Sequence, residues 1–214
     1  RANRNGAQAL VDALLVHGAD LGFCVPGESY LPVLDALHGA KSRFRLITCR
    51  HESGAANMAE AHGKLTGKPG ICFVTRGPGA TNASIGVHTA FQDSTPMILF
   101  IGQVARGDME REAFQEIDYR RMFGPMAKWV AQIDSADRVP ELIVRAFSTA
   151  TSGRPGPVVL ALPEDMLVDP CGSADTKPYV PVEPAPAASD MARLGAMLAK
   201  AERPLAMRGA GEVG

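Results

Sequence analysis

The sequence has almost no net charge, because 22 lysine and arginine residues face 23 aspartate and glutamate residues, for a formal net charge of −1. It lacks the basic surplus typical of proteins that bind nucleic acid or anionic membranes. No apolar run approaches the ~18 residues of a membrane-spanning helix. The first residues, Arg1 to Asn5, contain no apolar signal core. We therefore expect a cytoplasmic protein that binds neither nucleic acid nor a membrane.

Motifs for metal binding and for nucleophilic catalysis are also missing. His51-Glu52 begins like the zinc motif HExxH, but position 55 is alanine. Gly27-Glu28-Ser29 does not continue as the nucleophile motif GxSxG. The cysteines have no CxxC spacing and lie mostly in apolar segments, which favours buried thiols over a disulfide or a metal site. They are Cys24, Cys49, Cys72 and Cys171. We expect no metal ligands in this chain.

Helix-like and strand-like segments alternate over about the first 165 residues. Such alternation predicts an α/β fold with a doubly wound parallel sheet that helices cover on both faces. The expected strands are 21–25, 44–49, 71–75, 97–101, 129–133 and 158–162. The expected helices are 7–17, a helix capped by Ser29 that runs to Leu37, and 52–65, 80–91 and 135–149. Segment 102–125 has no clean periodicity, and we predict a loop that carries binding residues.

The composition changes after this alternating region. Five prolines fall between Pro170 and Pro186, which is typical of an extended linker. A helix at 191–201 and a strand at 204–207 follow. We therefore predict an N-terminal domain at 1–169, a proline-rich linker at 170–189 and the start of a truncated central domain at 190–214, so that the chain is a fragment.

Glu52 is the first candidate for chemistry. It stands between an apolar strand and an alanine-rich helix, at the carboxyl end of the strand, where open α/β sheets place their ligands. The plain alternative is a solvated glutamate that the helix dipole favours at this position. Ala55, Ala59 and Gly63 form a stripe of small residues that lets another backbone approach, so we infer that the helix is buried against a partner. Glu52 would then be partly shielded from water, a setting that suits proton transfer.

Two glycine turns follow other strands. Gly77-Pro78-Gly79 joins a strand to a helix, and Pro26-Gly27 ends the first strand. Backbone amides at a helix N-terminus can bind phosphate, but the spacing matches neither GxGxxG nor GxxxxGK[ST]. Taken alone, the turn at Gly77 is as consistent with tight backbone geometry as with an anion site, and the Pro26-Gly27 turn favours tight geometry more strongly.

Taken together, these segments resemble the thiamine diphosphate enzyme superfamily in order and spacing. The resemblance is closest to the large-subunit group of acetolactate synthases and covers about residues 5–170. It rests on Val25-Pro26-Gly27, Arg50-His51-Glu52, the run GPGATN from Gly77 to Asn82, Gly102-Gln103-Val104, the run AFQE from Ala113 to Glu116, and the run ATSGRPGP from Ala150 to Pro157.

The resemblance implies a pyrimidine-binding domain and a role for each matching residue. In the family, the glutamate matching Glu52 hydrogen-bonds N1′ of the cofactor's aminopyrimidine and helps to move its proton. The implied catalytic residues are Glu52 and Gln115. The implied cofactor-binding residues are Val25, Pro26, Gly27, Glu52, Pro78, Gly79 and Asn82. The glycine turns would thus flank the pyrimidine, and the phosphate interpretation is set aside.

The resemblance also implies that the chain carries half of a site. In the family, a different domain binds the diphosphate and its Mg²⁺, and the GDG motif of that domain does not occur here. The complete site forms between two subunits, so a homodimer or homotetramer through the pyrimidine domain is expected. A 2-keto acid is the expected substrate, and FAD is left open. The isolated chain is expected to be inactive and to bind thiamine diphosphate weakly.

One departure from the family pattern bears on the reaction. Many acetolactate synthases have a second glycine after the Pro-Gly pair, where this chain has Glu28-Ser29. The leading hypothesis is an enzyme that decarboxylates a 2-keto acid and transfers the product to an acceptor, as acetolactate synthase does. The alternatives are an oxalyl-CoA decarboxylase or sulfoacetaldehyde acetyltransferase type of enzyme, and a binding module that has the fold without catalysis.

Overall fold

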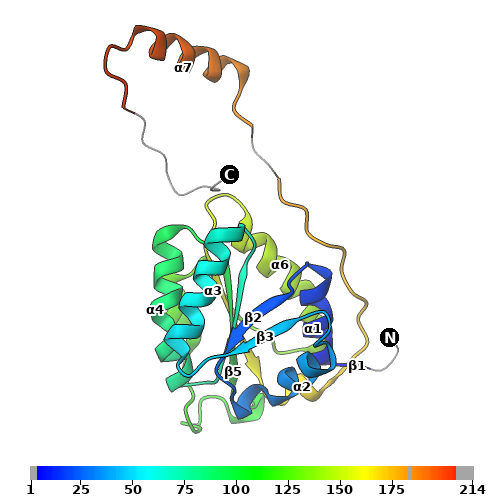
Figure 1. The fold of residues 1–214 in the computed structure, drawn as a ribbon. Helices are drawn as coiled ribbons and strands as arrows, with labels where there is room; N and C mark the ends of the chain where they lie inside the picture. The colour runs from blue at the N-terminus through cyan, green and yellow to red at the C-terminus, as the bar shows by residue number, and fades with distance from the viewer. Residues whose placement is uncertain (1–3, 183–184, 206–214) are drawn as a thin grey trace.

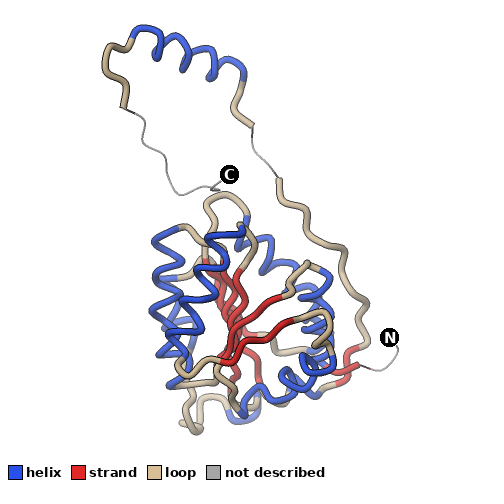
Figure 2. The backbone as a smooth tube through the Cα atoms, in the orientation of Figure 1, coloured by secondary structure: helices blue, strands red, loops and turns tan. Residues whose placement is uncertain are grey.

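A six-stranded parallel sheet forms the centre of the protein, in a computed structural model that describes residues 4–182 and 185–205 (Figures 1 and 2). Its strand order is β3-β2-β4-β5-β7-β6. The strands are β2 (Leu21–Cys24), β3 (Arg45–Thr48), β4 (Gly70–Val74), β5 (Met97–Gln103), β6 (Trp129–Gln132) and β7 (Pro157–Pro163). The predicted doubly wound parallel sheet is confirmed.

Two layers of helices cover the two faces of the sheet (Figure 1). One layer holds α1 (Gly6–Val16), α2 (Leu31–Gly39) and α6 (Val139–Thr151), and the other holds α3 (Glu52–Thr66), α4 (Pro78–Asp93) and α5 (Tyr119–Phe123). Because neighbouring side chains on a strand point to opposite faces, Phe73 and Phe100 pack in the first layer with ring centroids 4.9 Å apart. Cys72 and Leu99 pack in the second. The central strands are therefore apolar along their whole length.

The small-residue stripe on α3 is buried, and the contact lies within the chain. Ala55, Ala59 and Gly63 are buried. A Cβ placed on Gly63 would come within 2.2 Å of the carbonyl oxygen of Pro96. A Cβ on Gly86 of α4 would come within 2.6 Å of Cβ of Ala56. The sheet and α4 are thus the elements that α3 packs against, and the glycines allow this close approach.

The prediction that Ser29 caps α2 is wrong. Residues Glu28–Tyr30 form a short 3₁₀ turn, and Tyr30 occupies the N-cap position without a side-chain cap. Ser29 is instead fully buried, and its hydroxyl forms a hydrogen bond with Thr75 Oγ1 at 2.8 Å. Sequence pattern suggested a cap because serine is common there, whereas the turn draws the side chain inward.

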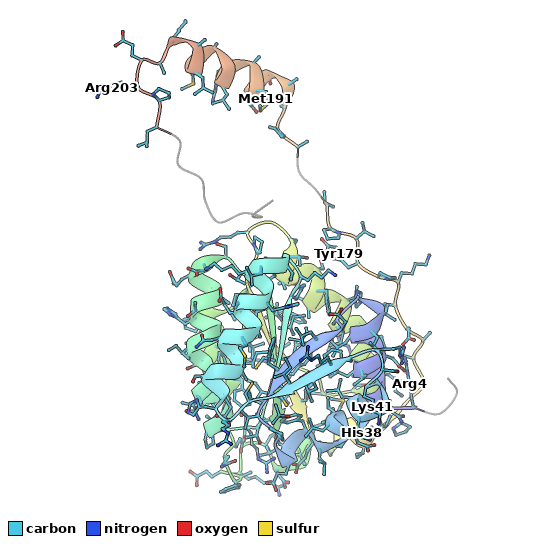
Figure 3. All side chains as sticks on the ribbon, viewed as in Figure 1. Arg4, His38, Lys41, Tyr179, Met191 and Arg203 are labelled. Carbon is cyan, nitrogen blue, oxygen red and sulfur yellow. The ribbon has the colours of Figure 1, made fainter. Side chains whose placement is uncertain are left out.

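The proline-rich segment is held to the domain at its start. Its first residues form β8 (Pro170–Cys171), which pairs antiparallel with β1 (Arg4–Asn5). Arg4 donates from Nη2 to the Ser173 carbonyl at 2.8 Å and forms an ion pair with Asp175. The Tyr179 amide donates to Nδ1 of His17 at 3.2 Å. Figure 3 shows Arg4 and Tyr179 along this side of the domain.

Helix α7 (Ala188–Lys200) follows and has no buried residue. It stands apart from the sheet in Figures 1 and 3. The strand predicted at 204–207 falls partly on residues 206–214, which lie outside the described residues; Pro204 and Leu205 belong to no strand. In the described part of the chain, no helix is long and apolar enough to cross a membrane.

Candidate functional site

The candidate site lies where the strand order reverses. Strand β2 lies between β3 and β4, so the chain moves one way from β2 to β3 and then crosses back to β4. Helix α2 follows β2 on one face and α4 follows β4 on the other. The loops after β2 and β4 therefore lie at the carboxyl ends of neighbouring strands where the order reverses, the usual ligand position in such sheets.

The first turns of α3 and α4 bring Glu52 and Asn82 together. Glu52 is the first residue of α3, and His51 caps this helix by accepting from the Ser53 amide at 3.2 Å. Asn82 lies early in α4 and donates from Nδ2 to Oε2 of Glu52 at 3.0 Å. Both side chains are half-buried. A hydrogen bond to a carboxylate is among the stronger kinds, so Asn82 fixes the orientation of the Glu52 carboxyl group.

The second oxygen of Glu52 is open toward Gly79. Among the described residues, no group donates a hydrogen bond to Oε1. A Cβ placed on Gly79 would stand 3.5 Å from this oxygen and 2.9 Å from Cγ2 of Thr75. A methyl group at Gly79 would therefore require a shift of Thr75, and the glycine keeps this position beside Oε1 free of a side chain.

Gly27 and Thr75 join the loops after β2 and β4. A Cβ on Gly27 would come within 2.6 Å of Cβ of Thr75, so only glycine fits between the two loops. Thr75 is held in turn by the buried hydroxyl of Ser29. Val25 and Pro26 complete the loop after β2, and the Val25 carbonyl accepts a hydrogen bond from the buried Tyr30 hydroxyl. Burial raises the pKa of Tyr30, which keeps this phenol protonated as a donor.

The loop after β5 brings Gln115 against the turn at Gly77. A Cβ on Gly77 would come within 2.6 Å of Cβ of Gln115, and φ at Gly77 is +58°, a left-handed conformation that favours glycine. The Gly77 amide donates to the Tyr119 hydroxyl at 3.0 Å. Burial raises the pKa of Tyr119 to about 12. The phenol therefore stays neutral and accepts the amide hydrogen bond.

The structure assembles the predicted site residues in two groups. Glu52 meets Asn82 beside Gly79, and Gln115 meets Gly77 next to Pro78, which is exposed. No hydrogen bond joins Glu52 to Gln115 within the described residues. Sequence reasoning missed four residues that hold these groups in place: Ser29, Thr75, Arg76 and Tyr119. Thr75 and Arg76 directly precede the glycine motif in the sequence, which was a usable signal, whereas the distant Tyr119 carried none.

Metal ligands do not cluster in this part of the molecule. In residues 4–182 and 185–205, no group of three or more histidine, cysteine, aspartate or glutamate side chains is placed to hold a metal ion. The chemistry that the described site offers is therefore a fixed carboxyl group with one open oxygen, a polar amide on its other oxygen, and glycine turns that bring the loop backbones close together beside it.

Comparisons with known proteins show what this chain is similar to. A family model described as "Thiamine pyrophosphate enzyme, N-terminal TPP binding domain" matches residues 4–122. The acetolactate synthase large subunit of Parasynechococcus marenigrum (strain WH8102) is 44% identical over 184 residues, which are 84% of this chain and 28% of that protein. The acetolactate synthase isozyme 2 large subunit of Escherichia coli (strain K12) is 37% identical over 210 residues, 97% of this chain and 37% of that protein. The chain spans about a third of the length of these relatives.

Proposed function

Because this chain belongs to the thiamine pyrophosphate enzymes, in their N-terminal TPP-binding domain, we propose that it supplies the pyrimidine half of a thiamine diphosphate site. The observation that carries the proposal is the Glu52–Asn82 pair, whose open oxygen faces the space beside Gly79. This is a carboxyl group held in one orientation, with one oxygen left for a ring nitrogen.

The residues present fit an aminopyrimidine. A ring nitrogen needs one hydrogen-bonding carboxyl oxygen, and Oε1 of Glu52 is free to serve among the described groups. A flat ring needs close backbone approach, and Gly27 and Gly79 allow the loops to come together, because a Cβ would lie 2.6 Å from Thr75 at Gly27 and 2.9 Å from it at Gly79. Val25, Pro26 and Pro78 supply apolar surface at the same loops. We assign these residues, together with Asn82, to cofactor binding.

Glu52 would hold or release a proton at the pyrimidine N1′. When bound, thiamine diphosphate supplies the electron sink for decarboxylation of a 2-keto acid. Asn82 keeps the carboxyl group of Glu52 from rotating, and the half-buried position limits competition from water. Gln115, fixed beside Gly77, adds a polar amide at the edge of the same region. We assign Glu52 and Gln115 as catalytic residues.

For the whole protein, we propose the reaction type that its relatives' names indicate. The full-length enzyme decarboxylates a 2-keto acid and transfers the product to an acceptor, as acetolactate synthase does. A related reaction of the oxalyl-CoA decarboxylase or sulfoacetaldehyde acetyltransferase type is the second candidate. Glu28 favours keeping it, because this carboxylate lies directly after Gly27 with its side chain 78% exposed.

The site also requires parts that this chain does not carry. We propose that residues 1–169 form the pyrimidine domain, 170–189 a linker and 190–214 the start of a central domain, and that another domain brings Mg²⁺ and the diphosphate contacts. FAD remains a further candidate cofactor. We propose a homodimer or homotetramer in the cytoplasm. Exposed apolar side chains on α3 and α4 support an interface there: Met58 is 39% exposed, Leu65 83% and Ile85 55%.

The test uses the full-length protein with thiamine diphosphate, Mg²⁺ and a panel of 2-keto acids. Glu52→Gln should lower turnover at least ~100-fold, the lower limit of a typical general acid–base contribution. Glu60→Gln is the matched control. Glu60 lies on the same helix, is buried and accepts from Thr95 Oγ1 at 2.9 Å, a bond that an amide oxygen also accepts. Near-normal turnover in Glu52→Gln, or equal losses in both variants, would contradict the proposal.

A further inference from the structure

Arg76 is a buried cation in the candidate site for which the proposed function gives no role. It follows Thr75 directly, and its side chain is only 10% exposed. Burying a guanidinium group is costly unless its donors are satisfied. The two carboxylates near it lie closer to water, with Glu164 42% exposed and Glu28 78% exposed. Stability alone is therefore a poor reason for an arginine here, since a smaller apolar residue would avoid the desolvation.

The Arg76 side chain links the loops that form the site. Its Nε donates to the Phe114 carbonyl at 3.1 Å, and its Nη1 donates to Oε2 of Glu164 at 3.0 Å. Its Nη2 lies 3.6 Å from Oε1 of Glu28. These partners follow β5, β7 and β2 respectively. The planar guanidinium group can reach these partners in different directions at the same time, whereas the single ammonium group of lysine cannot.

The Phe114 carbonyl is the important partner, because the next residue is Gln115. Gln115 has φ of +64°, and Glu110 and Glu112 in the same loop are also in the left-handed region at +61° and +54°. Non-glycine residues adopt this conformation only where the surroundings enforce it. The loop therefore stores strain at several positions, and its contacts must hold it in place.

Other contacts anchor the two ends of this loop, and Arg76 holds the segment at Gln115. At the start, Arg106 donates from Nε to Oδ2 of Asp165 at 2.8 Å. At the end, Gln103 donates from Nε2 to the Ile117 carbonyl at 3.0 Å. Between these ends, the Glu116 carboxylate accepts from the Glu110 amide at 2.7 Å within the loop, and Arg76, in the loop after β4, makes a side-chain hydrogen bond to the backbone beside Gln115.

We propose that Arg76 is a positioning residue, which holds Gln115 in its strained conformation against Gly77 through the Phe114 carbonyl. It takes no part in the chemistry itself. The catalytic role of Gln115 in this proposal rests on the proposed function. The position in which Gln115 is held rests on the geometry alone. Removing the bond should release residues 109–116 while the sheet and the Glu52–Asn82 pair stay in place.

The first test measures hydrogen exchange in the cofactor-free, full-length protein. Arg76→Lys retains a positive charge but cannot reach Phe114 and Glu164 together. Amides in 109–116 should exchange about tenfold faster or more, which corresponds to ~1.4 kcal/mol. The matched control is Arg154→Lys, because Arg154 also donates to a backbone carbonyl, that of Gln92 at 3.1 Å, at the far end of α4. It should leave exchange in 109–116 unchanged. Unchanged exchange in Arg76→Lys would overturn the proposal.

The second test separates positioning from general damage. Arg76→Lys should lower kcat about tenfold with KM changed by less than about twofold, because the bond orders a catalytic group. In a Gln115→Ala background, the same substitution should lower kcat by less than about twofold more, since residues that act as one unit are not additive. An additive loss would overturn the proposal. An unchanged kcat despite faster exchange would refute the catalytic role that the proposed function gives Gln115 and leave the positioning standing. Full activity of Glu52→Gln would instead refute the proposed function and leave the exchange result standing.

A second variant covers the case in which Arg76→Lys does not fold. Glu164→Gln leaves Arg76 in place and removes the charge that orients its Nη1. Exchange should accelerate in 109–116 and remain unchanged in the strands. If exchange in that segment stays at the level of the unsubstituted protein although Arg76 has lost its charged partner, the segment does not depend on how Arg76 is held, and the proposal is wrong.

Discussion

Replacing Asn82 with aspartate tests the contact on which the site depends. In the structure, the Asn82 amide donates to Oε2 of Glu52 at 3.0 Å. Aspartate has nearly the same shape but presents an acceptor, so two carboxyl groups would meet at this distance. Two unit charges about 3 Å apart repel by ~5 kcal/mol at an effective dielectric constant of about 20. Side chains held this close will share a proton rather than both ionise.

The size of the effect follows from the cost of that proton. Protonating a carboxyl group with an ordinary pKa near 4.3 costs ~1.36 kcal/mol per pH unit, or about 4 kcal/mol at pH 7. This is less than the repulsion, so the folded variant takes up a proton. The folded carboxyl pair then has a pKa raised above its unfolded value. The variant is therefore most stable at low pH and loses stability as the pH rises. Its destabilisation relative to the unsubstituted protein should shrink from about 4 kcal/mol at pH 7 to about 1 kcal/mol at pH 5.

Urea denaturation of the 214-residue chain at pH 5, 6 and 7 measures this dependence. Asn82→Ala is the control, because it removes the hydrogen bond without adding a charge. It should lower the free energy of unfolding by about 1.5 kcal/mol, since both side chains are half-buried, with little change between pH 5 and 7. If Asn82→Asp destabilises the chain equally at pH 5 and pH 7, the two side chains do not meet as described.

Two further substitutions test the packing around the site. Gly79→Ala should lower the affinity for thiamine diphosphate about tenfold or more in calorimetry on the full-length protein, because the new Cβ would stand 3.5 Å from Oε1 of Glu52 and 2.9 Å from Thr75; unchanged affinity would show that the space beside Gly79 is not used. Gly70→Ala should destabilise the chain by more than about 3 kcal/mol in urea denaturation, because its Cβ would fall 1.8 Å from the Ala59 carbonyl oxygen. Gly54→Ala is the control: its Cβ meets nothing within 4 Å, so this variant should be neutral or stabilising. Similar stabilities of the two variants would contradict the packing of α3.

Strands and helices were predictable because their patterns are local. The apolar run 97–101 favoured a buried central strand, and it lies in β5 with both faces covered. Glu52 was predictable as a candidate because a carboxylate between a strand and a helix is a local feature, and it is the first residue of α3. Strand order was open, since periodicity does not say which strands are neighbours.

The contacts within the site could not be predicted in the same way. The partner of Ser29 is Thr75, 46 residues away, and that of the Gly77 amide is Tyr119, 42 residues away. Local pattern suggested a helix cap for Ser29 and gave no sign of Tyr119. Arg76 contacts loop 102–125 at the Phe114 carbonyl and pairs with Glu164, and these contacts become visible only when the carboxyl ends of the strands are assembled.

Proton transfer by Glu52 is the central claim, and the exchange rate of the C2 proton of bound thiamine diphosphate tests it most directly. The measurement compares the full-length protein with its Glu52→Gln variant, both saturated with cofactor and Mg²⁺, by following deuterium incorporation at C2. Glutamine retains the hydrogen-bonding shape but cannot exchange a proton at N1′. We predict that C2 exchange slows by about 100-fold or more. An exchange rate within about threefold of the unsubstituted protein would contradict the account.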